Sequence, residues 1–562
     1  MTTTSPSDGR PAPRAFWLVI LTGLGLISAL FVACSTVSDP DVTPTPTRTP
    51  RPPSPTPTPI PSPTPTPAWP VTAGCGDAVP EDVCDRFREA VDHDPEHFAW
   101  IEDPMLADVQ VQEEELPHSR RFATRVYALV APFFTLEDGV SAADLEATWT
   151  EEATGPFVQH PLLVSAEAQR ALPGGPPAGD VQILEPSKVL SETLERDAWA
   201  VVPFDDLDPR WKVLRVEDMS PLDRNLDLNS YPLATSLYLG SGTRPDALPL
   251  LPDGDTNRDP ERMTVVMMTG VTALTRGTAR TMEREGVTYP ARDVEAWLIE
   301  PDITHISNEV SFAEDCPTPR AESTMVFCSD PDYFGLLEHV DTDVLELTGN
   351  HLLDWGVSAM ENSLELYQER DLPFFGGGWT LEEARQPLTV THGVHTFGFL
   401  GCNPIGPSYA WATAERPGAA SCDYDLLVSQ VRDLRERGIL PIVTFQYWEV
   451  NQYHPTTRQQ ADFRAVAEAG AVIVSGSQAH WPQGFDFHAG AFIHYGLGNL
   501  FFDQMQRLEY RQEFLDRHVF YDGRYISAEL LTAMLEDYAR PRPMTTEERR
   551  SLLEATFAVS SW

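Results

Sequence analysis

The sequence predicts an α/β fold, with a layered α/β domain in its C-terminal half and a smaller α/β domain before it. Apolar runs typical of buried strands alternate with helical stretches between Met263 and Asp503, which is an α/β pattern. Each run ends in polar residues, and ligands of such sheets bind beyond the carboxyl ends of the strands. The same polar residues are therefore expected to meet at one site.

Five blocks define the C-terminal pattern. Each begins with an apolar strand: Met263 to Arg276, Ile303 to Phe312, Val344 to Gly356, Leu440 to Glu449, and Ala471 to Gln483 with its continuation Phe492 to Asp503. Helices are expected between them, at Ser358 to Arg370, Asp425 to Glu436 and Gln459 to Ala469. The tail from Gln504 to Trp562 is expected to form helices that pack on the sheet.

The region from about 71 to 258 mixes strand and helix signals. Phe122 to Phe134 is strand-like, and Ser141 to Trp149 reads as a helix with Ser141 as its N-cap. The order of these elements, with a later Tyr231 to Leu233, resembles part of a periplasmic substrate-binding domain of the phosphate-binding type. An accessory domain that binds no small ligand is the alternative. The polar, turn-rich run Leu251 to Asp259 marks the expected boundary before a second domain, 261 to 562.

The N-terminus predicts a location outside the cytoplasm. Arg10 and Arg14 precede an apolar run that ends in Ala33-Cys34, which resembles a bacterial lipoprotein signal over residues 1 to 34, with lipid on Cys34. Phe31 departs from that pattern, and an uncleaved signal anchor is the alternative. Both readings hold the protein on the outer face of the cytoplasmic membrane. Residues 35 to 70, rich in Thr-Pro and Ser-Pro, are expected to form an extended, disordered stalk.

Charge and cysteines narrow the chemistry. The net charge of -44 argues against a nucleic-acid partner, because a nucleic-acid binder needs a basic face. Outside the cytoplasm disulfides persist. Leaving Cys34 for lipid, the other six cysteines form three near neighbours, and local pairing is expected: Cys75 with Cys84, Cys316 with Cys328, and Cys402 with Cys422. Free buried thiols are the alternative for each pair.

The order of the five blocks resembles the CapA family, the poly-γ-glutamate capsule synthesis proteins, which look like distant relatives of calcineurin-type metallophosphatases. Asn350, His351, Asp354 and Gly356 match the family's third block, and Tyr495, Leu497, Gly498 and Asn499 match its last. The resemblance covers Met263 to Asp503 and implies a metallophosphatase-type layered sandwich.

The departures from the family fall on the chemistry. Val271 stands where the family has its first Asp, Gln446 where the fourth block has His, and Gln478 where the fifth has its first His. Valine cannot ligate a metal, and glutamine offers only a neutral carbonyl. The resemblance then leaves one hard divalent ion, held by Glu309 and His480 with help from Asn350, or no metal at all.

Seven residues are expected to line one cleft at the strand ends: Asn308, Glu309, Asn350, His351, Gln446, Gln478 and His480. His351 is the candidate general acid or base, oriented by Asp354. Two functions stay open. One is a possible metal-dependent hydrolase of capsule or poly-γ-glutamate-type polymer metabolism with a degraded metal site. The other is a non-catalytic surface lipoprotein that binds a small polar ligand or an anionic cell-surface polymer.

Overall fold

The computed structural model describes residues 69–562, apart from 117, 176, 180 and 321–324. The predicted signal segment, Cys34 and nearly all of the predicted stalk lie outside the described residues. No helix within the described part of the chain is both long enough and apolar enough to cross a membrane.

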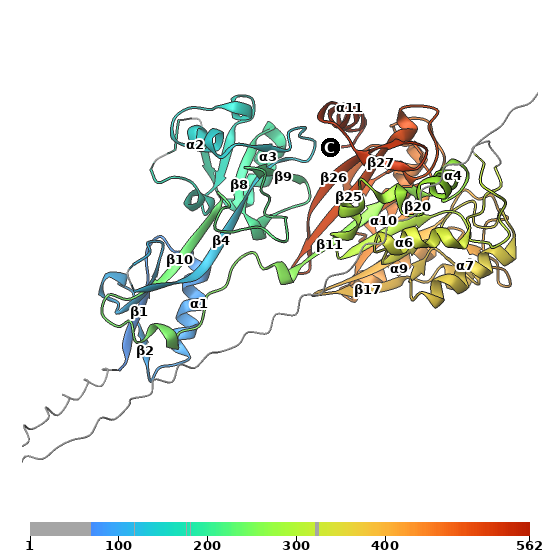
Figure 1. Cartoon of the computed structure of the whole chain (residues 1–562). Coiled ribbons are helices and arrows are strands. Elements are labelled where there is room, and N and C mark those ends of the chain that lie inside the picture. Colours follow the sequence, from blue (N-terminus) through green and yellow to red (C-terminus); the bar gives the residue numbers. More distant parts are fainter. Residues whose placement is uncertain (1–68, 117, 176, 180, 321–324) are drawn as a thin grey trace, which may run out of the picture. The chain divides into compact units, whose positions relative to one another are not determined.

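The N-terminal region, residues 69–258, has two apolar cores joined by the long strand β4. Phe122 and Ala123 of β4 belong to one core, and its segment from Val126 to Ala131 belongs to the other. β10 pairs with β4, and Figure 1 shows both strands running between the two halves. The elements are β1 (Val71–Cys75), α1 (Glu81–Asp92), β2 (Phe98–Trp100), β3 (Val109–Gln112), β4 (Ser119–Pro132), β5 (Gly139–Val140), α2 (Ala142–Thr150), β6 (Leu162–Ser165), β7 (Gln182–Leu184), α3 (Pro186–Arg196), β8 (Trp199–Pro203), β9 (Trp211–Val216) and β10 (Ala234–Gly240).

The C-terminal region, residues 261–562, is built on two larger sheets. One sheet has the order β15-β14-β13-β11-β25-β26-β27, and the other has the order β17-β18-β20-β21-β23-β22. Strand β13 runs parallel to β14 and β20 runs parallel to β21, as helical crossovers between consecutive strands require.

The strands of this region are β11 (Met263–Thr269), β12 (Val271–Thr272), β13 (Ile303–Asn308), β14 (Val344–Glu346), β15 (Phe374–Phe375), β16 (Gly377–Gly378), β17 (Leu388–His392), β18 (His395–Cys402), β19 (Gly418–Ala419), β20 (Leu440–Gln446), β21 (Ile473–Ser477), β22 (Phe485–His488), β23 (Ala491–His494), β24 (Asn499–Phe501), β25 (Gln512–Tyr521), β26 (Arg524–Glu536) and β27 (Arg540–Pro543). The helices are α4 (Arg276–Glu285), α5 (Glu295–Ile299), α6 (Phe334–His339), α7 (Val357–Glu369), α8 (Leu381–Ala384), α9 (Tyr424–Glu436), α10 (Thr457–Glu468) and α11 (Thr546–Phe557).

Three apolar cores stack these elements into four layers. The first core lies between the sheets and contains Val266 and Ile303 from one sheet and Ile442 and Ile473 from the other. The second packs the outer face of the first sheet against residues of α4, α6 and α7. The third packs the outer face of the second sheet against α9 and α10. The predicted layered α/β sandwich is thus confirmed, with helices outside and two sheets within.

The tail after Asp503 corrects a prediction. It was expected to be helical, but β25, β26 and β27 form an antiparallel extension of the first sheet, and only α11 is a long helix. The sequence of β26, RYISAELLTAMLE, is rich in helix formers. Pairing along nearly its whole length with β25 overrides that local preference, since propensity is only a weak prior.

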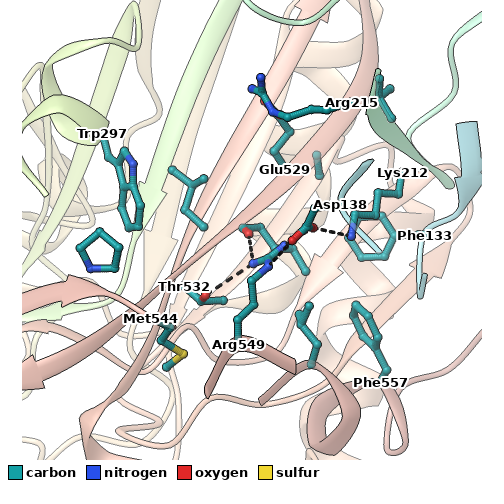
Figure 2. Close-up of a pocket in the computed structure, with 16 residues that line it drawn as sticks. Phe133, Asp138, Lys212, Arg215, Trp297, Glu529, Thr532, Met544, Arg549 and Phe557 are labelled. Carbon is teal, nitrogen blue, oxygen red and sulfur yellow. Dashed lines mark hydrogen bonds and ion pairs between the residues drawn. The ribbon is translucent and has the colours of Figure 1, made fainter. Parts of the chain in front are cut away.

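The N-terminal and C-terminal regions contact each other through apolar and charged side chains. Val519, Tyr521 and Ile526 of β25 and β26 belong to the same apolar core as the second half of the N-terminal region. Beside them, Asp138 accepts hydrogen bonds from Lys212 of the N-terminal region and Arg549 of α11, at the edge of a pocket of about 300 Å³ (Figure 2).

Candidate functional site at the strand ends

The space between the two sheets becomes polar toward the carboxyl ends of the strands. Side chains of a strand alternate between its faces, so every second residue points into this space. Along β20 the sequence runs from Ile442, in the apolar core, through Thr444 to Gln446, all buried. Along β13 it runs from Ile303 through His305 to Ser307. The alternation in the sequence therefore builds a buried polar zone under the predicted site.

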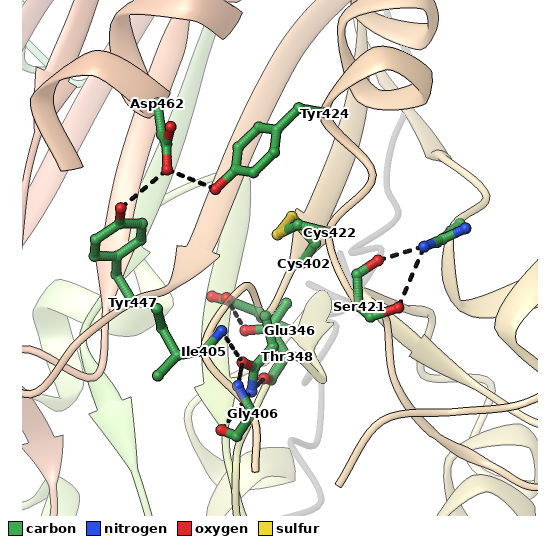
Figure 3. Close-up of a disulfide and its surroundings, with 12 residues drawn as sticks. Glu346, Thr348, Cys402, Ile405, Gly406, Ser421, Cys422, Tyr424, Tyr447 and Asp462 are labelled. Carbon is green, nitrogen blue, oxygen red and sulfur yellow. Dashed lines mark hydrogen bonds between the residues drawn. A yellow bond between two sulfur atoms is a disulfide. The ribbon is translucent and has the colours of Figure 1, made fainter. Parts of the chain in front are cut away.

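Hydrogen bonds join this zone across the two sheets. The hydroxyl groups of Ser307 and Ser477 lie 3.0 Å apart. Within the first sheet, Nε2 of His305 lies 3.1 Å from Oε2 of Glu346. The other carboxylate oxygen of Glu346 accepts a hydrogen bond from the hydroxyl of Thr348 (Figure 3). These contacts fix the positions of the strands that carry the site.

Four of the predicted site residues meet at the side chain of Gln446. Its Nε2 lies 3.1 Å from Oε2 of Glu309 and 3.1 Å from Oδ1 of Asn350, and it also contacts Oε1 of Gln478. Gln446 ends β20, and Glu309 and Gln478 directly follow β13 and β21. Asn350 lies in the loop after β14. Gln478 has a φ of 73°, a left-handed backbone that non-glycine residues rarely adopt and that often marks functional positions.

Close backbone approach makes this cluster possible. A Cβ on Gly349 would lie 2.4 Å from Cα of Glu309, so only glycine allows the loop after β14 to pass so near the end of β13. Gly349 therefore brings Asn350 next to Glu309.

Acceptor oxygens crowd around one donor nitrogen in this cluster. An amide nitrogen carries two hydrogens, yet three oxygens surround Nε2 of Gln446. Within the described residues, Oε1 of Glu309, Oε1 of Gln446 and Oγ1 of nearby Thr272 are buried without a hydrogen-bond partner. Buried polar atoms are normally paired, so such orphans indicate a special role.

His351 and Asp354 form a second unit beside the cluster. Nδ1 of His351 lies 2.6 Å from Oδ2 of Asp354, which is held in turn by the backbone N–H of Phe327 at 3.0 Å. Burial lowers the pKa of His351, but the bond to Asp354 and the charge of Glu309 outweigh it and raise that pKa above its ordinary value. Because His351 directly follows Asn350 in the chain, the two units lie side by side.

Two predicted residues make other contacts. Nδ1 of His480 lies 2.8 Å from Oδ1 of Asn499, and its ring packs on Phe502. Asn308 donates to the carbonyl of Val310 and to the hydroxyl of Tyr367 on α7. Both residues are buried near the strand ends, but neither has a recorded hydrogen bond to Gln446, Glu309 or Asn350.

An apolar cluster and a guanidinium group complete the site, and apart from Val271 the sequence did not single out their residues. Val271 packs with Phe327 and Phe502 in a small buried cluster. The Arg276 guanidinium lies 4.7 Å from the ring centre of Phe327 and 4.9 Å from that of Phe502, and it pairs with Asp503. Arg276 and Asp503 are the charged residues that close the first and last blocks, which is the signal that could have found them.

A groove of about 580 Å³ lies on the outer side of β20, because side chains alternate along a strand and Tyr447 packs with α9 and α10 while Gln446 faces the other sheet. Its wall includes Tyr447, the neighbouring Trp448, which is 52% exposed, and Tyr424. The hydroxyl groups of Tyr447 and Tyr424 donate to Asp462 at 2.9 and 2.7 Å (Figure 3). The exposed ring of Trp448 gives the groove an apolar surface that a ligand could contact.

The three expected disulfides are present in the structure. Cys75 pairs with Cys84, Cys316 with Cys328, and Cys402 with Cys422. The last of these lies at the groove, whose wall includes Cys422 (Figure 3).

The site fits the metal ions of a metallophosphatase poorly. Among the described residues, no three His, Cys, Asp or Glu side chains are grouped so that they could hold a metal ion. Nε2 of Gln446, which has no lone pair to offer, lies where the oxygens of Glu309, Asn350 and Gln478 converge. Val271 contributes only an apolar side chain.

Comparison with known proteins gives one family match. Residues 265–504 match the family described as bacterial capsule synthesis protein PGA_cap. The capsule biosynthesis protein CapA of Bacillus anthracis is 26% identical over 257 residues, which cover 44% of this chain and 62% of that protein. The PGA biosynthesis protein CapA of Bacillus subtilis is 26% identical over 171 residues, 30% of this chain and 45% of that protein. The chain thus spans less than two thirds of either relative.

Solved structures match more distantly. An ABC-type phosphate transport receptor from Vibrio cholerae is 14% identical with a TM-score of 0.28, covering 32% of this chain and 90% of the receptor. The NAD nucleotidase of Haemophilus influenzae is 9% identical with a TM-score of 0.30, covering 53% of this chain and 57% of the enzyme. Neither TM-score is high enough to support a statement about function. Residues 265–504 of this chain thus form a domain that matches the family of bacterial capsule synthesis proteins to which the CapA relatives point.

Proposed function

We propose that the protein acts at the cell surface in capsule or poly-γ-glutamate-type polymer metabolism, held at the outer face of the cytoplasmic membrane by its N-terminus. The family match of residues 265–504 is the observation that carries this proposal. Two relatives are named for capsule and PGA biosynthesis. Because the chain spans less than two thirds of either relative, their roles come to this chain only as a proposal.

The retained part of the family's third block supports a chemical role for the site. The imidazole of His351 is held by Asp354. The side chain of His351 is 11% exposed, so a ligand can reach it. An imidazole in this position can move a proton, and Asp354 sets which nitrogen carries it. The groove whose wall includes Tyr447, Trp448 and Tyr424 offers a separate surface for an extended polymer.

A non-catalytic binding protein is the second candidate. Val271 and Gln446 favour it, because they replace the side chains that a metal-dependent hydrolase would need. In this alternative the groove and the N-terminal region hold a surface polymer or a small polar ligand, and the strand-end residues stabilise the fold.

Deletion of the gene in its host tests the proposal through the amount of surface polymer. We expect the deletion to lower that amount and the full-length gene to restore it. Unchanged polymer in the deletion strain would contradict the proposed function.

Complementation with His351→Gln separates the two candidates. The wild-type level of polymer with this variant, at equal protein level, would favour binding, whereas loss of restoration would favour a chemical role for His351. Asp433→Asn, at an exposed position on α9, is the control and should restore the polymer fully.

A further inference from the structure

We infer that this CapA-like domain has replaced its metal ions by groups of its own chain, with the carboxamide of Gln446 occupying an oxygen cage formed by Glu309, Asn350 and Gln478. The inference rests on the family match of residues 265–504 and is independent of the polymer proposed above. It predicts that the wild-type chain holds no divalent ion at the strand ends, and that removal of one side chain creates a site for one.

The geometry around Gln446 is that of a cation site filled by a donor group. Three oxygens, one of them from a carboxylate, point at Nε2, two of them at 3.1 Å. Carboxylate and amide oxygens are the ligands of hard cations, which bind them at roughly 2.0 to 2.6 Å. The contacts to Glu309 and Asn350 are longer than cation–oxygen bonds, as expected when a nitrogen donor lies at this point. Since it carries hydrogens instead of a lone pair, it competes with a cation for the same point.

The unpaired atoms of the cluster support this interpretation. Two hydrogens on Nε2 cannot serve three acceptors, and Oε1 of Glu309 is left without a partner within the described residues. A side chain that had evolved only to satisfy Glu309 would leave no acceptor over. An excess of acceptor oxygens is expected where a neutral amide has replaced a metal cation.

Beside the oxygen cage, apolar side chains stand where metal ligands would be expected. Val271, at the position of the family's first Asp, packs against Phe327 and Phe502, and the three form part of a buried apolar cluster. The ring of Phe327 lies 4.0 Å from that of His351, so apolar surface borders the imidazole. No ligand oxygen is available from Val271.

Arg276 supplies the positive charge in this half. Its guanidinium lies over Phe327 and Phe502 and pairs with Asp503, and its charge acts on the pKa of His351. A fixed guanidinium repels a divalent cation. The carboxylate of Asp503 therefore has its counter-charge within the chain.

Metal analysis of the full-length chain in detergent, dialysed against Mn²⁺ and then against metal-free buffer, tests the inference. We expect the wild type to retain less than about 0.1 ion per chain and Gln446→His to retain about one, because imidazole then joins the oxygens of the cage. Gln446→Ala, which opens the cage without adding a ligand, should gain weaker Mn²⁺ binding detectable by titration. Gln386→His adds a histidine at an exposed position and should gain none.

Each outcome decides for or against the inference. Tight retention of Mn²⁺ by the wild type that Glu309→Gln abolishes would overturn it. It would equally be overturned if Gln446→His and Gln446→Ala both kept the circular dichroism and melting behaviour of the wild type and neither gained an ion. Gain of an ion by Gln446→His that is lost again in the double variant with Glu309→Gln supports it. Surface polymer in the host plays no part in these readouts, so failure here leaves the proposed function standing.

Discussion

Gln446 and Glu513 are buried polar side chains of the C-terminal region with opposite surroundings. Gln446 has three acceptors around one donor nitrogen. Glu513, on β25, is fully buried, and within the described residues neither of its carboxylate oxygens has a hydrogen-bond partner. The first arrangement can be explained by the site, whereas the second is a plain cost to stability.

Glu513 makes stability depend on pH. Burial raises the pKa of Glu513 well above its ordinary value, so the folded chain binds a proton that the unfolded chain releases. This contribution to stability is fully present below the unfolded pKa, roughly 4.3, and is lost as the pH rises toward the folded pKa.

Glu513→Gln should therefore stabilise the protein at alkaline pH. We expect a gain in the free energy of unfolding at pH 8, about 1.4 kcal/mol for each unit by which the folded pKa exceeds the unfolded one, because glutamine is neutral at any pH, and little gain at pH 4. Thermal unfolding of variant and wild type at both pH values measures it. Glu547→Gln, exposed on α11, should show no pH-dependent difference. A variant less stable than the wild type at pH 8 would contradict this account.

At the scale of elements, the strand ends determine which residues meet. The third disulfide joins the end of β18 to the segment before α9 and so fixes one side of the groove. The short loop that it closes limits the unfolded chain, which is the main way in which a disulfide stabilises a protein.

Replacement of both Cys402 and Cys422 by Ala should lower the free energy of unfolding by about 2–4 kcal/mol. Denaturant titration of the variant measures the loss. Peptide mapping of the wild type without reduction checks the pairing, and a cross-link between Cys328 and Cys402 would refute it. Reducing agent should lower the stability of the wild type while leaving the difference between the two proteins smaller.

The sequence predicted those elements whose local pattern and final environment agree. The apolar runs of β11, β13, β20 and β21 are buried on both faces and end in polar residues, so both their existence and their meeting point could be predicted. The strands β25 and β26 could not, because β26 is rich in helix formers and its strand state comes from pairing with β25.

The site was predictable only in part for the same reason. Glu309, Asn350, Gln446 and Gln478 lie at strand ends, and topology alone brings them together. The position of Arg276 depends on Phe327, which lies in a loop far along the chain, and no periodicity in the sequence indicates that contact. Likewise, no sequence pattern predicts that the amide nitrogen of Gln446 would lie among oxygens of the other three.

At the scale of the whole described chain, one ion-pair group links the N-terminal region to α11. Oδ1 of Asp138 lies 2.7 Å from Nζ of Lys212 and 2.9 Å from Nη2 of Arg549. Burial raises the pKa of Asp138, but Arg549 and Lys212 outweigh it and hold that pKa at about 2. The side chain of Asp138 is 53% exposed, so solvent screens the group and limits its contribution to stability.

Asp138→Asn should weaken the contact between the two regions modestly. We expect a loss of about 0.5–1 kcal/mol at neutral pH and low salt, which falls as salt rises. Because the folded pKa is depressed, the wild-type advantage is present above the unfolded pKa and disappears as pH falls toward about 2. Urea unfolding at two salt concentrations measures the loss, with Asp433→Asn, an exposed pair on α9, as the control. A loss that is equal at both salt concentrations would contradict the electrostatic explanation.

The central claim is that Gln446 stands in place of a metal ion in this CapA-like domain. An X-ray structure of the full-length chain from crystals soaked in Mn²⁺, with anomalous data, tests it most directly. We expect Nε2 of Gln446 to lie among the oxygens of Glu309, Asn350 and Gln478, with no anomalous peak within roughly 2.6 Å of Glu309. An Mn²⁺ peak bound by Glu309, with the Gln446 side chain turned away, would contradict the claim.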